Sequence, residues 1–107
     1  MLEIIFLMFF AHALADGTFQ PQRMSLGKRR YCNEKYNPLW YQWLFSHAMT
    51  HGGFVYLITN SVDLGIAEFI THAVIDFLKT EGIIGCKADQ FLHIFCKCAW
   101  VFVFLGV

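Results

Sequence analysis

Residues 45–54 read F-S-H-A-M-T-H-G-G-F, and this stretch holds the pattern that decides the fold. Its two histidines, His47 and His51, are four residues apart, so on a helix they lie on one face, one turn apart. The surrounding sequence from 38 to 59 is mostly apolar and aromatic. That length matches the roughly 20 residues that cross a bilayer core as a helix. The sequence therefore predicts a helix over 38–59 with two imidazoles on one face.

Three more apolar segments of similar length lie at about 2–19, 62–79 and 88–107. Each of them carries one polar pair with the same four-residue spacing: His12 and Asp16, His72 and Asp76, Asp89 and His93. Since every segment presents one such pair on one face, these faces are expected to meet. We predict an all-α, four-helix transmembrane bundle with an inward-facing His/Asp cluster, formed by residues 1–107 as a single helical membrane domain.

The composition indicates where such a bundle resides. Charged residues make up 15% of the 107 residues, against about 25% in ordinary soluble domains. A small soluble domain exposes a large share of its surface and needs more polar cover than this. The net charge is zero, so nothing in the overall balance attracts nucleic acid. We therefore expect a lipid bilayer around the chain, with a homo-oligomer or a membrane protein partner as further contacts, and no nucleic acid.

The positive charges predict an orientation. The loop at 20–37 carries five Lys or Arg residues, and the turn at 79–88 carries Lys79 and Lys87. Four spans place these two loops on the same side, and basic loops favour the cytoplasmic side. The sequence predicts a multi-pass protein with both basic loops in the cytoplasm.

The N-terminus allows a competing interpretation. Residues 13–15 read A-L-A, which is typical of a signal-peptide cleavage site. However, the chain begins Met-Leu-Glu without Lys or Arg, and His12 interrupts the end of the apolar run. We therefore expect residues 1–15 to belong to the first helix.

Imidazole nitrogens and carboxylate oxygens on facing helices are typical of metal sites in helical bundles. The chemistry of such ligands suits one or two divalent transition metal ions, with Zn, Mn, Fe and Ni all compatible. A polar network without metal remains an alternative, because Asp and His inside a membrane pair with one another in any case. The predicted metal ligands are His12, Asp16, His47, His51, His72, Asp76, Asp89 and His93.

The order of these motifs resembles a known family. A-H-A-L-A-D-x-x-x-Q at 11–20 is followed by Lys28, H-A-M-T-H at 47–51, H-A-V-I-D-F-L-K at 72–79 and D-Q-F-L-H at 89–93. This order is similar to that of the domain-of-unknown-function 3307 family of small bacterial and phage inner-membrane proteins, over about residues 9–102. The resemblance implies an inner-membrane location. More distantly, the His/Asp-rich helices are similar to those of membrane-bound metal-dependent hydrolases.

Together these features predict a small integral membrane metal-binding protein that hydrolyses a phosphoester or lipid at the cytoplasmic leaflet. A metal-bound water would attack, and an aspartate would serve as general base. The expected catalytic residues are Asp16, Asp76 and Asp89, and the expected substrate-binding residues are Gln20, Lys28 and Lys79. Two alternatives remain open: a phage- or bacterial-type membrane interaction or inhibitor protein with a structural metal, and an ion or proton carrier.

Overall fold

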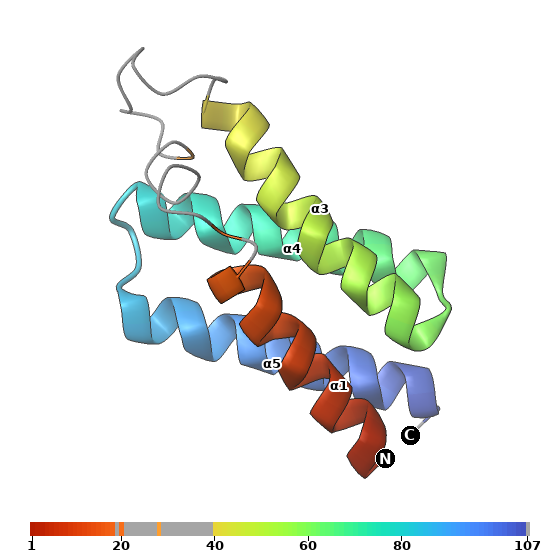
Figure 1. Ribbon diagram of the computed structural model, residues 1–107. Coiled ribbons are helices and arrows are strands. Elements are labelled where there is room, and N and C mark those ends of the chain that lie inside the picture. Colours follow the sequence, from red (N-terminus) through yellow and green to blue (C-terminus); the bar gives the residue numbers. More distant parts are fainter. Residues whose placement is uncertain (19, 21–27, 29–39, 107) are drawn as a thin grey trace.

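The computed structural model describes residues 1–18, 20, 28 and 40–106, and the described residues form helices and no strands. Figure 1 shows four helices: α1 (Leu2–Ala13), α3 (Trp40–Thr59), α4 (Val62–Thr80) and α5 (Cys86–Leu105). The predicted all-α class with four helices is confirmed. Helix α4 contacts both α3 and α5, and α1 packs against α3 and α5.

Helices α3 and α4 form an antiparallel hairpin (Figure 1). Asn60 adopts a left-handed backbone conformation with φ 56°, which Asn tolerates better than most residues. The Ser61 hydroxyl then accepts a hydrogen bond from the Leu64 backbone N–H at 3.2 Å and caps α4. The predicted start of α3 at residue 38 lies outside the described residues.

The first predicted helix, 2–19, is not uniform. Regular α-helix ends at Ala13, and Leu14–Thr18 forms a π-helical turn that carries Asp16. Gln20 donates a side-chain hydrogen bond to the Asp16 carbonyl at 3.0 Å, which satisfies one of the carbonyls left open at a helix end. Single π-turns are frequently found at functional sites.

The last helix begins earlier than predicted, at Cys86 rather than 88, and it ends at Leu105. Gly85 precedes its first turn, and its carbonyl accepts the Asp89 backbone N–H at 2.9 Å. Asp89 therefore lies in the first turn of α5, where a carboxylate is favoured by the helix dipole.

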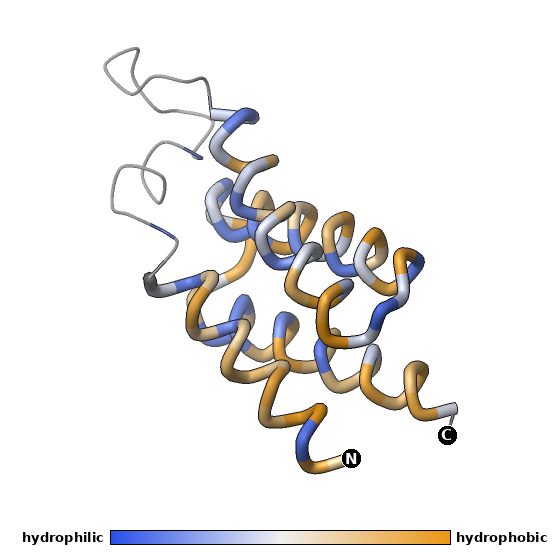
Figure 2. Tube along the Cα trace, turned by 45° about the vertical axis from the view of Figure 1, so that its right-hand side comes forward, coloured by the Kyte–Doolittle hydropathy of each residue, from blue (hydrophilic) through white to orange (hydrophobic). Residues whose placement is uncertain are grey.

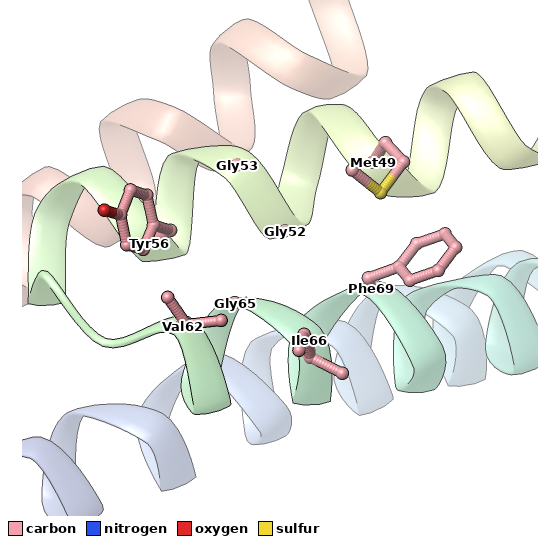
Figure 3. A pocket seen from close by; sticks show the side chains of 8 residues that line it. All are labelled: Met49, Gly52, Gly53, Tyr56, Val62, Gly65, Ile66 and Phe69. Carbon is pink, nitrogen blue, oxygen red and sulfur yellow. The ribbon is translucent and has the colours of Figure 1, made fainter.

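Helices α3 and α4 approach closely at Gly52 and Gly65. A Cβ atom at Gly52 would lie 2.7 Å from the Gly65 carbonyl oxygen, and one at Gly65 would lie 3.0 Å from the Gly52 oxygen. Only glycine permits this separation, which lets side chains one or two turns away meet across the pair. Figure 3 shows the apolar groove at this crossing, lined by Met49, Gly52, Gly53, Tyr56, Val62, Gly65, Ile66 and Phe69.

The distribution of polarity is the reverse of that in most soluble domains. Among the described residues, the buried set holds nine hydrophobic residues and ten polar or charged ones. Large hydrophobic side chains such as Phe6, Leu57, Ile70 and Phe95 are more than half exposed. Figure 2 shows long hydrophobic stretches in every helix, interrupted by hydrophilic positions.

Of the helices in the described part of the chain, only α5 is long and apolar enough to cross a membrane by length and composition. Helix α1 has 12 residues and measures about 18 Å at 1.5 Å per residue, whereas a bilayer core is about 30 Å thick. Helices α3 and α4 lose mean hydropathy to their buried polar residues, His47 and Asp76 among them. This criterion does not support the predicted four spans.

The glycine crossing yields a prediction with a matched control. We expect Gly52→Ala to lower the free energy of unfolding by about 1–3 kcal/mol, because its Cβ would overlap the backbone of α4. Gly53→Ala, one residue along the same helix, has no atom within 4 Å of the added Cβ. It should be neutral or stabilise by up to about 1 kcal/mol. Chemical denaturation of the purified protein measures both, and equal effects would contradict the close approach.

Candidate metal centre

Four of the predicted ligands form one compact group. Asp16, His47, His51 and His72 each offer one ligand atom, and these atoms all lie within 4.8 Å of one another. Asp16 comes from the π-helical turn, the middle two residues from α3 and His72 from α4. We call these four residues the four-ligand group. The three histidines are each 1% exposed, whereas the Asp16 side chain is 25% exposed, so the group reaches from the interior toward the surface.

The carboxylate of Asp16 faces imidazoles. Its Oδ1 lies 2.8 Å from His51 Nε2 and 3.3 Å from His47 Nε2, and its Oδ2 lies 3.2 Å from His12 Nε2. His47 Nδ1 is buried without a hydrogen-bond partner among the described residues. A buried polar atom left unpaired costs about 1–3 kcal/mol, so its presence calls for an explanation. A cation among these residues would provide one.

The histidine rings pack as a column between α3, α4 and α5. The centroids of His51 and His72 are 3.7 Å apart, and those of His72 and His93 are 4.1 Å apart, with the rings nearly parallel in both pairs. His47 lies edge-on to His51 at 4.9 Å. The four-residue spacing on each helix thus places rings from three helices in direct contact.

A cavity of about 180 Å³ opens beside the four-ligand group, and we call it the polar chamber. Liquid water occupies about 30 Å³ per molecule, so the chamber has room for several waters or for a phosphate group. It brings together all three predicted catalytic aspartates and all three predicted substrate-binding residues. The residues that line it are Asp16, Gln20, Lys28, His47, His72, Asp76, Lys79, Asp89, Gln90 and His93.

The other predicted ligands lie around the four-ligand group rather than in it. Asp76 Oδ2 is 3.9 Å from His47 Nε2. Asp89 Oδ1 and His93 Nε2 are 3.1 Å apart and pair with each other on α5. His12 Nε2 also lies 3.3 Å from the side-chain oxygen of Gln90. The structure thus brings all eight predicted ligands into one region and divides them into a group of four and its surroundings.

The buried carboxylates differ in their cationic partners. Three of them each have a lysine nearby: Asp76 with Lys28 at 2.6 Å, Glu68 with Lys97 at 3.2 Å, and Asp89 with Lys79 at 3.9 Å. Asp16 has no lysine or arginine partner among the described residues, and its contacts are histidines. One negative charge of the cluster is therefore left without a cation in the described part of the chain.

Two further buried charges, Glu68 and Lys97, were not among the predicted site residues and are 1% and 4% exposed. Lys97 Nζ lies 3.2 Å from His12 Nδ1 and 3.3 Å from His51 Nδ1, besides its pairing with Glu68. The Trp100 indole N–H donates to Glu68 Oε1 at 2.8 Å. A signal for both existed, because Glu68 precedes His72 by four residues and Lys97 follows His93 by four. If the four-residue spacing had been extended by one turn beyond the histidine of each pair, it would have included both residues.

The buried pair predicts a large stability effect. Glu68→Gln leaves the Lys97 ammonium buried without its counter-charge, and we expect a loss of about 3–5 kcal/mol in the free energy of unfolding. The double variant Glu68→Gln with Lys97→Met removes both charges and should lose much less. Denaturant titration compares them. A single variant that is no less stable than the double variant would argue against a buried ion pair.

Comparison with known proteins identifies the family. No curated protein and no solved structure matches the chain. The model of the family described as "Protein of unknown function (DUF3307)" matches residues 4–105, which include all four helices except the first two residues of α1. The resemblance found in the motifs is thereby confirmed at the level of the family: the chain belongs to the DUF3307 family.

Proposed function

We propose that this protein binds one divalent transition metal ion within the four-ligand group and uses it to hydrolyse a phosphoester at a membrane surface. The observation that carries the proposal is the negative charge of Asp16, which histidines surround. Among the described residues it is the carboxylate of the cluster without a lysine, and it lies 3.3 Å from Nε2 of His47, whose buried Nδ1 has no hydrogen-bond partner there. Ligand atoms about 2 Å from a metal lie about 3–4 Å apart, so small side-chain shifts would close the group around an ion.

The polar chamber supports hydrolysis rather than a purely structural metal. A bound metal would lower the pKa of a water and supply the nucleophile. Asp89 and His93 line the chamber outside the four-ligand group, and their 3.1 Å pairing suits them to take up the proton of that water. Asp76 holds Lys28 in place at 2.6 Å. Asp89 and His93 would thus accept the proton, and Asp76 would position Lys28.

The charges indicate an anionic substrate. The lysines at the chamber, Lys28 and Lys79, are each paired with an aspartate and contribute no net charge. Asp16 adds one negative charge, which a divalent ion would convert to one net positive charge. Only the metal-bound chamber would therefore favour an anion such as a phosphate group. The ammonium groups of the two lysines can donate hydrogen bonds to the oxygens of that anion. We therefore propose a phosphoester, either soluble or in a lipid headgroup.

The exterior supports a membrane location. Exposed apolar side chains occur on every helix, with Phe6 on α1, Leu57 on α3, Ile70 on α4 and Phe95 on α5. Patches of this extent mark contacts with lipid or with another protein. Averaged hydropathy understates α3 and α4, because it counts their buried polar residues, such as His47, Glu68 and Asp76, as if they faced outward. We propose that lipid surrounds the helices and that the ends near Lys28 and Lys79 face the cytoplasm, as basic loops favour.

Metal content is the first test. We expect about one equivalent of Zn, Mn, Fe or Ni in detergent-purified protein, measured by elemental mass spectrometry. His47→Ala combined with His72→Ala should lose it, since both belong to the four-ligand group. His12→Gln is the matched control, because this partly buried histidine lies outside the group, and it should retain the metal. Folded protein without metal would refute the site, and equal loss in the control would refute the assignment of ligands.

Hydrolysis is the second test. The metal-loaded protein should cleave phosphomonoesters, phosphodiesters or phospholipids presented in mixed micelles. His93→Gln should lower kcat by about 10²–10⁴-fold, the usual contribution of an acid–base group. Lys79→Met should mainly raise KM, since Lys79 is the more exposed of the two chamber lysines. Phosphate release measures both. Metal binding without turnover on any of these substrates would favour a structural metal or a carrier.

A further inference from the structure

Lys97 occupies an unusual position behind the four-ligand group. Its ammonium is 4% exposed and lies within 3.3 Å of three acceptors: Glu68 Oε2, His12 Nδ1 and His51 Nδ1. An ammonium carries three N–H donors and no acceptor, so all three contacts are donated by Lys97. Both histidines must then accept at Nδ1.

This requirement fixes the proton on the other nitrogen of each ring. A neutral imidazole that accepts at Nδ1 carries its hydrogen at Nε2. His51 Nε2 lies 2.8 Å from Asp16 Oδ1, which is a hydrogen-bond distance from an N–H to a carboxylate. His12 Nε2 lies 3.2 Å from Asp16 Oδ2. Lys97 thus directs an N–H from each side onto Asp16.

A nitrogen that carries a hydrogen has no lone pair for a metal. His51 therefore belongs to the four-ligand group by position, yet in this tautomer it cannot coordinate through Nε2. Asp16, His47 and His72 remain as the available ligands. Three protein ligands with an open position are typical of catalytic metal sites, whereas four closed ligands are typical of structural ones.

We propose that Lys97 is a positioning residue that keeps the metal site open by holding His51 as a hydrogen-bond donor to Asp16. The inference rests on the proposed metal site and assigns a cause to its reactivity. Removal of the ammonium frees His51 to carry its hydrogen at Nδ1 and to coordinate through Nε2. The open position then closes.

A thermodynamic cycle with cobalt tests this role. Lys97→Leu, which offers no donor and no ligand atom, should bind Co²⁺ about tenfold or more tightly than the unaltered protein, the scale of effect known for residues that orient ligands. His51→Gln should cancel this gain in the Lys97→Leu background. Azide should perturb the visible Co²⁺ spectrum of the unaltered protein and not that of Lys97→Leu. Lys97→Arg keeps a donor and should retain the azide response.

The metal-free protein provides a second readout that does not depend on the folding of a Lys97 variant. Nitrogen-15 NMR of the unaltered protein, with His51 assigned by its substitution, should show the Nε2–H tautomer. The Nδ1–H tautomer at His51, or an unchanged Kd and azide response in folded Lys97→Leu, would overturn the role of Lys97 alone. Absence of Co²⁺ binding in every variant would overturn the metal site and this inference together.

Discussion

The structure depends on one constraint: charged groups buried under an apolar exterior must be compensated inside the protein. Moving an unpaired charge out of water costs several kcal/mol even after relaxation, so each buried carboxylate needs a cation or several donors. Glu68 meets this need with Lys97 and Trp100, and Asp76 meets it with Lys28. These pairs tie α4 to α5 and to Lys28. The helices are therefore held together by their polar faces as well as by packing.

The close approach of α3 and α4 makes this polar interior possible. Gly52 and Gly65 remove the side chains that would separate the two backbones, and His51 and His72 stack at 3.7 Å as a result. A wider separation of α3 and α4 would place water or a void between the two rings. On α3 the glycine follows His51 directly in sequence, whereas on α4 Gly65 precedes His72 by seven residues, about two helical turns.

The sequence predicted the helices and most of the site because both follow one periodic rule. Residues four apart share a helix face, so the spacing alone assigns His47 with His51, and Asp89 with His93, to common faces. The spacing does not tell which residues belong to the four-ligand group and which lie around it. That division depends on how far each helix is shifted along its axis relative to the others, and on the π-helical turn at Asp16. The four spans predicted from segment length are not supported by averaged hydropathy, which singles out only α5 among the helices in the described part of the chain.

Charge compensation also orders the events at the proposed site. Under the proposed function, the charge of Asp16 would repel an anionic substrate from the polar chamber of the metal-free protein. A divalent ion would reverse the sign, so a phosphate group would be attracted only to the metal-bound protein. Since the paired lysines are neutralised by Asp76 and Asp89, they add donors without adding net charge. Binding of the anion brings the chamber back toward neutrality, which suits a site surrounded by apolar residues.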